Sequence, residues 1–192
     1  EYGADATRWY MISNAQAWDN LKFDLEGLAE VKRKFFGTLY NTYAFFALYA
    51  NIDGFIYNED DINLDERPEI DRWILSELNS LIKEVGSFLD DFEATKATRA
   101  IQFFVNENLS NWYVRLCRRR FWKGDYGKDK ISAYQTLYTC LETLAILASP
   151  IAPFFMDKLF DDLNQVTKKT KLESVHLSQW PKVNFEAINT NL

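Results

Sequence analysis

Residues 93–122 read EATKATRAIQFFVNENLSNWYVRLCRRRFW, and this stretch decides how the rest of the chain is arranged. Apolar side chains recur along it at spacings of four, three and four: Val105, Leu109, Trp112 and Leu116. This spacing predicts a single amphipathic helix, roughly 45 Å long at 1.5 Å per residue. Two aspartates at positions 90 and 91 precede the stretch as a turn and cap, and the glycine-containing run at 124–127 ends it.

Four other segments show the same three-to-four spacing of apolar residues. They are residues 28–50, 70–92, 131–148 and 155–166. Asp24 is a candidate N-cap for the first of them. Long helices with one apolar stripe each predict an all-α fold, an antiparallel bundle of about five long helices. The tail after them is expected to be short and irregular or strand-like, with an extended segment at residues 174–180.

The chain is expected to divide into three parts, with residues 1–23 as the end of a preceding unit. Residues 24–170 are expected to form the bundle, and residues 171–192 a C-terminal tail or linker. The connector at residues 51–71 carries eight acidic side chains against one arginine, which predicts a solvated segment. The chain opens Glu1-Tyr2-Gly3 without methionine, so we expect it to be a piece of a longer protein.

Composition excludes several classes of function. The 192 residues carry 22 Lys and Arg against 28 Asp and Glu, a net charge of −6, so any nucleic-acid contact must use a local basic patch. One histidine and two cysteines are too few for a four-ligand zinc site, and no phosphate-binding glycine pattern occurs. The most apolar window, residues 141–155, is shorter than the roughly 20 residues that cross a bilayer. The low cysteine content favours the cytosol.

Basic residues gather where the quoted stretch ends, with seven between positions 115 and 130 against two aspartates. Five lie on the helix or directly after it: Arg115, Arg118, Arg119, Arg120 and Lys123. One interpretation is structural, because cations interact favourably with the C-terminal end of the helix dipole. The other is a phosphate-binding patch, because guanidinium groups match phosphate oxygens and interleaved aromatic rings can stack on RNA bases. Of these rings, Trp112 is expected in the core, whereas Trp122 is a candidate base platform.

Smaller sets of cations also have two interpretations. Lys32, Arg33 and Lys34 form a second basic cluster, either a solvated helix face or a second RNA contact. Three lysines at positions 168, 169 and 171 either reach RNA or cap the last helix. Arg8 is expected to brace a junction with a preceding domain, and His176 is expected to be structural.

Residues 111–122, NWYVRLCRRRFW, resemble a helix signature of isoleucyl-tRNA synthetases. Four further segments resemble the same family in the same order: residues 2–10 (YGADATRWY), 71–78 (DRWILSEL), 144–159 (LAILASPIAPFFMDKL) and 174–181 (SVHLSQWP). The first is similar to the helix that follows the KMSKS loop of class I synthetases, and the second to the start of their anticodon-binding bundle. Cys117 stands where the family is more variable, and no function is attached to it.

The resemblance implies that the whole enzyme is an isoleucine–tRNA ligase, which uses ATP and Mg²⁺ in its catalytic domain. The HxGH and KMSKS elements of that domain are absent from these 192 residues, so no catalytic residue, cofactor or metal is assigned here. Residues 1–23 would be the end of the stem-contact region. Expected partners are isoleucine tRNA and the catalytic domain of the same chain. We expect a monomer in the cytoplasm with no membrane contact.

The implied ligand of this region is the anticodon stem-loop. The five cations from Arg115 to Lys123 would contact its phosphates, Trp122 would stack on a base, and Asn108 or Asn111 would read base edges. Two alternatives stay open: a helical protein–protein interaction module, and the same domain of a valyl- or leucyl-type synthetase. A carboxylate-bridged metal bundle is rejected, because it needs histidines on facing helices.

Overall fold

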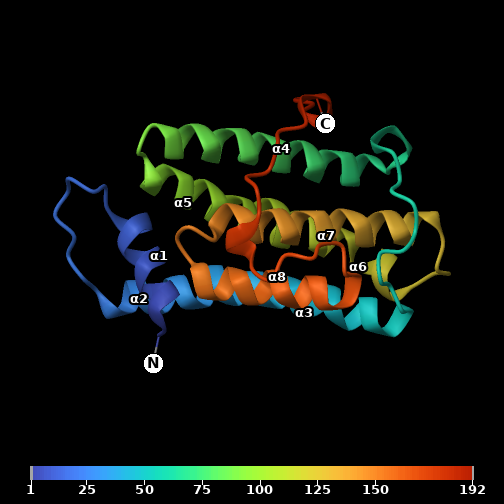
Figure 1. The fold of residues 1–192 in the computed structure, drawn as a ribbon, viewed down its shortest axis with the longest axis horizontal. Coiled ribbons are helices and arrows are strands. Elements are labelled where there is room, and N and C mark those ends of the chain that lie inside the picture. Colours follow the sequence, from blue (N-terminus) through green and yellow to red (C-terminus); the bar gives the residue numbers. More distant parts are fainter. Residues whose placement is uncertain (1, 192) are drawn as a thin grey trace.

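The computed structural model describes residues 2–191, and every regular element in that range is a helix or a helical turn (Figure 1). The helices are α1 (Ala4–Asn14), α2 (Leu25–Val31), α3 (Gly37–Asp53), α4 (Glu69–Asp90), α5 (Ala94–Phe103), α6 (Arg115–Trp122), α7 (Lys128–Ala148) and α8 (Pro153–Thr167). Two π-helical segments, Lys32–Phe36 and Phe104–Val114, join α2 to α3 and α5 to α6 without a break. With these segments joined, the long helical stretches are residues 25–53, 69–90, 94–122, 128–148 and 153–167. The predicted all-α antiparallel bundle of about five long helices is therefore confirmed.

The ends of the helix at residues 25–53 follow from local chemistry. Asp24 caps its start, because the side chain accepts hydrogen bonds from the backbone N–H groups of Glu26 and Gly27, at 3.1 and 3.2 Å. Gly54 ends it in the left-handed region, with φ of 71°, which a residue without a Cβ adopts at little cost. The predicted cap is confirmed.

The helix at residues 94–122 buries the first half of the predicted stripe, Val105 and Leu109, but departs from the second half, since Leu116 is 56% exposed. Its buried side chains recur every four residues: Val105, Leu109, Tyr113, Cys117 and Phe121. A π-helical turn is wider than an α-helical turn, so the segment Phe104–Val114 rotates the buried face away from the predicted spacing. The expectation that Trp112 is buried is therefore wrong, since its side chain is 57% exposed.

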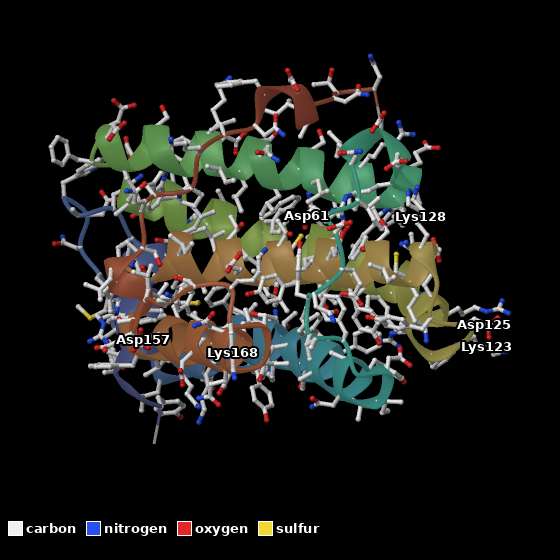
Figure 2. The ribbon with its side chains drawn as sticks, turned by 45° about the vertical axis from the view of Figure 1, so that its right-hand side comes forward. Asp61, Lys123, Asp125, Lys128, Asp157 and Lys168 are labelled. Atoms are coloured by element: carbon white, nitrogen blue, oxygen red, sulfur yellow. The ribbon has the colours of Figure 1, made fainter. Side chains whose placement is uncertain are left out.

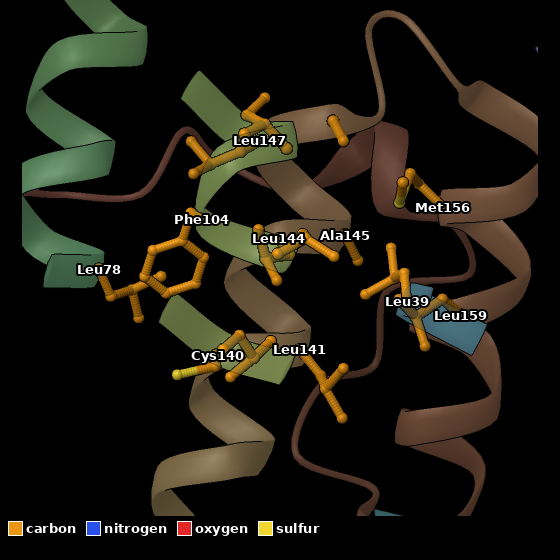
Figure 3. Close-up of a cluster of buried hydrophobic side chains, with 14 of the residues drawn as sticks. Leu39, Leu78, Phe104, Cys140, Leu141, Leu144, Ala145, Leu147, Met156 and Leu159 are labelled. Carbon is orange, nitrogen blue, oxygen red and sulfur yellow. The ribbon is translucent and has the colours of Figure 1, made fainter. Parts of the chain in front are cut away.

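The core lies around α7, most of which is buried (Figure 3). Figure 3 shows apolar side chains of α7 with those of α3, α4, α8 and the π-helical segment around them: Leu39, Leu78, Phe104, Leu141, Leu144, Met156 and Leu159. Because α7 touches nearly every other long helix, it fixes where the end of α6 lies relative to α3 and α4.

The acidic connector is held on α7 more firmly than a solvated segment would be. Most of its carboxylates are exposed, but the side chain of Gln135 accepts a hydrogen bond from the N–H of Ile62 and donates one to the C=O of Asp60, both at 3.0 Å. Arg67 donates to the hydroxyl of Thr136 at 2.8 Å. The connector therefore has a fixed path across the bundle.

The short helix α1 shares the core of the bundle. The Trp9 ring is fully buried and stacks on Phe35 with 4.0 Å between ring centroids. Arg8 donates to the C=O of Ile151 at 3.3 Å and pairs with Asp5, which holds α1 on the turn between α7 and α8. The division of the chain at residue 23 stays a prediction.

The C-terminal tail crosses the bundle and packs on α4, as Figure 1 shows in red. It contains two 3₁₀ turns, Val175–Leu177 and Phe185–Ala187, and residues 168–191 contain no strand. Of the two alternatives predicted for the tail, the irregular one is confirmed, and the expected extended segment at 174–180 is interrupted by the turn Val175–Leu177. Ser174 caps the first turn through the N–H of His176, which favours a turn over an extended chain. Across residues 2–191 no helix is long and apolar enough to span a membrane.

Candidate nucleic-acid interface

The C-terminal part of the helix at residues 94–122 presents cations and tryptophans to solvent. Trp112 and Trp122 are 57% and 54% exposed, and the four cations between and beside them are exposed as well. Residues three and four apart are neighbours on a helix, so positions 112, 115, 119 and 122 follow one another along one face. We call the following set the basic stripe: Trp112, Arg115, Arg118, Arg119, Trp122 and Lys123.

The opposite face of α6 fixes the stripe to the bundle. Cys117 and Phe121 are buried, and the Phe121 ring lies 5.1 Å from the rings of Tyr134 on α7 and Phe45 on α3, measured between centroids. Burial raises the pKa of the Cys117 thiol to about 11, so this group stays protonated at neutral pH. The stripe is thus carried by a rigid helix end.

Arg120 does not belong to the exposed set, although the sequence placed it with the phosphate-binding residues. Its side chain is 16% exposed and its guanidinium donates to both oxygens of Asp71, at 2.6 and 2.9 Å. It also contacts Asp129, through a carboxylate oxygen and the backbone C=O. These acceptors engage the guanidinium, so we assign Arg120 to positioning the helix end.

Asp71 is the centre of this buried network. It is fully buried and also accepts hydrogen bonds from the hydroxyls of Tyr113, at 2.8 Å, and Ser132, at 2.5 Å. Burial lowers the pKa of the Arg120 guanidinium, but hydrogen bonds from it to Asp71 and the Asp71 charge raise the pKa by more. Burial and the same carboxylate raise the pKa of Tyr113 well above its usual range. The network therefore ties α4, α6 and α7 together beneath the stripe.

The two candidate base readers differ in their surroundings. The amide of Asn108 donates to Glu77 on α4 at 2.7 Å and is half-buried, which makes it a link between helices. Asn111 is exposed and donates to Glu107 of its own helix at 3.2 Å. Asn111 is therefore the better placed of the two to meet a ligand.

The remaining cations near the stripe are paired with carboxylates of the connector or α3. Lys128 pairs with Glu66 at 3.1 Å, and Lys130 is buried against Asp53 at 2.9 Å. Within residues 2–191, Arg115, Arg118, Arg119 and Lys123 make no ion pair. Figure 2 shows Lys123 and Asp125 at the tip of this end of the molecule. Four of the seven predicted cations thus stay available to an external anion.

The second basic cluster lies at the other end of the bundle. Lys32, Arg33 and Lys34 are exposed near the start of the helix at residues 25–53, whereas the stripe lies at the end of the helix at 94–122 (Figure 1). Lys34 pairs with Glu30, and Lys32 lies over the ring of Tyr2 at 5.7 Å from its centroid. The structure does not bring this cluster together with the stripe.

Other residues singled out in the sequence have local roles. Lys168, Lys169 and Lys171 are all exposed, and Lys169 lies over the rings of Tyr57 and Tyr138, at 3.9 and 5.1 Å from their centroids. His176 is exposed in a 3₁₀ turn. Among the described residues, no group of three or more His, Cys, Asp or Glu side chains is arranged to hold a metal ion.

Sequence reasoning missed two residues beside the stripe, Asp71 and Trp73, both on the first turns of α4. Composition groups Asp71 with the solvated acids of the connector, and its partner Arg120 lies 49 positions away. Trp73 packs edge-on against Trp112, with 6.4 Å between ring centroids. An aspartate at the start of a helix whose apolar residues recur every three to four positions only weakly indicates a buried ion pair. Neither the Asp71–Arg120 pair nor the Trp73–Trp112 contact can be predicted from the spacing of residues within one helix.

Comparison with known proteins gives consistent results. The family described as "Anticodon-binding domain of tRNA ligase" matches residues 71–192. The isoleucine–tRNA ligase of Cytophaga hutchinsonii is 65% identical over 192 residues, which are 100% of this chain and 17% of that protein. The enzymes of the same name from Bacteroides thetaiotaomicron and Porphyromonas gingivalis are 61% and 63% identical over 100% and 95% of this chain, and 16% of each relative is covered.

A solved structure shares the fold. It is the crystal structure of a LeuRS from Agrobacterium radiobacter K84 in a ternary complex with tRNA and LeuAMS, with a TM-score of 0.67 and 18% identity, covering 98% of this chain and 20% of that one. The chain spans about a sixth of the length of the isoleucine–tRNA ligases it matches. On the family match and on its helical architecture, the chain belongs to the anticodon-binding domains of tRNA ligases.

Proposed function

We propose that this chain is the part of an isoleucine–tRNA ligase that binds the anticodon stem-loop of isoleucine tRNA, and that the basic stripe contacts its phosphates. The observation that carries the proposal is the group of four unpaired, exposed cations on one rigid helix end of a chain whose net charge is −6. Negative charge elsewhere repels RNA, so binding is confined to the stripe and oriented by it. The name shared by the most similar relatives supports the choice of isoleucine tRNA.

Each residue of the stripe has a role in this proposal. Arg115, Arg118, Arg119 and Lys123 bind phosphate oxygens and set the register of the stem-loop. Trp122 offers a ring on which an unstacked base packs. Asn111 is the candidate reader of a base edge. The cluster at residues 32–34 lies at the other end of the bundle, where it would meet only a more distant part of the tRNA.

The wider context belongs to the proposal as well. Activation of isoleucine with ATP would take place in parts of the enzyme outside residues 1–192. Residues 1–23 would be the end of the stem-contact region, residues 24–170 the anticodon-binding bundle and residues 171–192 a linker. The enzyme would act as a monomer in the cytoplasm, and this region would need no cofactor or metal of its own.

The test is fluorescence anisotropy with a labelled anticodon stem-loop of isoleucine tRNA at low salt. Changing Arg115 and Arg119 together to alanine should weaken binding, whereas changing Lys83 and Lys96 together should not. This control removes the same charge from α4 and α5, away from the stripe. A stem-loop with a replaced anticodon should bind more weakly than the native one. Equal affinity for both loops, or equal effects of the two double variants, would contradict the proposal; absence of any RNA binding would favour a protein-interaction module.

A further inference from the structure

An open hollow of about 550 Å³ lies beside the basic stripe, between the first turns of α4 and the π-helical segment. Its walls are Glu69, Ile70, Trp73 and Trp112. The two indole rings meet at 61° with 6.4 Å between their centroids. The hollow therefore offers aromatic surface from two rings to a ligand, and neither indole N–H is engaged by another group of the described residues.

The exposure of Trp112 follows directly from the π-helical register. In that register Tyr113 takes the buried position of its turn, and the neighbouring Trp112 is turned outwards to meet Trp73. Wide helical turns of this kind are frequent at functional sites. Trp112 and Leu116 are both more than half exposed and lie one helical turn apart, and contiguous exposed apolar surface commonly marks a binding site.

The charges around the hollow restrict what it can bind. Arg115 and Arg119 follow Trp112 by three and seven residues, so both guanidinium groups lie on the same helix face as the indole. On the opposite wall, Glu69 supplies an exposed carboxylate. A ligand that fits this set has a flat aromatic group, an anionic group on one side of it and a hydrogen-bond donor on the other. A nucleotide whose base carries an amino group has all three.

We propose that the hollow takes one unstacked nucleobase of the RNA loop, with one face against the exposed ring of Trp112, an edge toward Trp73 and an amino group donating to Glu69. This inference rests on the proposed function and deepens it, because it gives the stripe a site that reads a base as well as a backbone. Cytosine and adenine carry an amino group where uracil carries a carbonyl oxygen, which the Glu69 carboxylate repels, so a site that holds this position against Glu69 discriminates against uracil. The guanidinium groups of Arg115 and Arg119 hold the flanking phosphates.

The test uses a set of stem-loops in which each loop position in turn lacks its base. Stacking on an aromatic side chain changes affinity by about 5- to 150-fold per base. We expect that removing the base at one loop position weakens binding to the unchanged protein by a factor in this range. The same removal should not weaken binding to the Trp112→Leu variant, which has already lost the stacking surface. Trp112→Phe keeps a ring and should recover part of the affinity. Trp18→Leu is the matched control, since Trp18 is 71% exposed on the loop between α1 and α2.

Glu69→Gln gives a second measurement, the preference for cytosine over uracil, which should not change if Glu69 has only a structural role. At the position found, the unchanged protein should prefer cytosine to uracil, and Glu69→Gln should reduce that preference. The nucleobase site would be overturned if Trp112→Leu bound the native loop as tightly as the unchanged protein while Arg115→Ala/Arg119→Ala bound it weakly. That result would leave the proposed function standing. A loss spread evenly over all loop positions would also overturn it. Circular dichroism of each variant checks that the helices are intact.

Discussion

Replacing Asp71 by alanine should destabilise the domain more than almost any other single polar substitution. The carboxylate is fully buried and accepts four hydrogen bonds, two from Arg120 and one each from Tyr113 and Ser132. In the variant, the guanidinium keeps only Asp129 as a charged partner, and the buried hydroxyl of Tyr113 has lost its acceptor. Removing one partner of a buried ion pair costs about 3–5 kcal/mol. Since domains are stable by only about 5–15 kcal/mol, this is a large part of the total.

The assay is urea unfolding followed by far-ultraviolet circular dichroism, for Asp71→Ala, Arg120→Met and the double variant. Because the two side chains contact each other directly, the double variant should lose less stability than the sum of the singles, by about 1–3 kcal/mol. If Asp71→Ala does not fold, Asp71→Asn keeps the shape and allows the same cycle. A loss below about 1 kcal/mol for Asp71→Ala, or strict additivity, would refute the role given to this network.

Three further outcomes are expected. Burial raises the pKa of Asp53, but hydrogen bonds from Tyr134 and Lys130 lower this pKa by more. The Asp53 carboxylate therefore stabilises the fold fully above the unfolded-state pKa of about 3.9, and this stabilisation is lost as pH falls through the lower folded-state pKa. Asp53→Asn should flatten the loss of stability in acid unfolding titrations, and an unchanged slope would contradict this. A Cβ on Gly27 would lie 2.7 Å from Cε2 of the buried Tyr10 ring, so Gly27→Ala should cost about 1–3 kcal/mol in urea unfolding, and a neutral result would show that the ring moves freely. Both cysteines are buried, so they should react with a thiol reagent only at the rate of unfolding; rapid labelling of the native protein would contradict their burial.

The helices could be predicted from the sequence because each long helix carries its own periodic apolar stripe. The cap at Asp24 and the end of the helix at residue 122 follow from local chemistry in the same way. The tail could not be predicted as well, because a side chain that caps a single 3₁₀ turn, such as Ser174, leaves no periodic pattern.

The site was predicted only in part, and the errors have two physical causes. The spacing that placed Trp112 in the core assumed 3.6 residues per turn, whereas the π-helical segment is wider and turns it to solvent. Arg120 looks the same as its neighbours in the sequence, and only the fold brings it to Asp71. The same limit applies to Trp73, since pairs formed between distant helices are not visible in the spacing of either one.

The salt dependence of stem-loop binding tests the proposed interface most directly. Each phosphate contact contributes about −0.7 to −0.9 to the slope of log affinity against log salt concentration, so four cations give about −2.8 to −3.6. Arg115→Ala/Arg119→Ala should reduce the magnitude of the slope by about 1.4–1.8, while Arg120→Met should leave it nearly unchanged in protein that is shown to be folded. A slope near zero for the unchanged protein, or a slope that the Arg115→Ala/Arg119→Ala variant leaves intact, would contradict the assignment of the basic stripe as the RNA-binding surface.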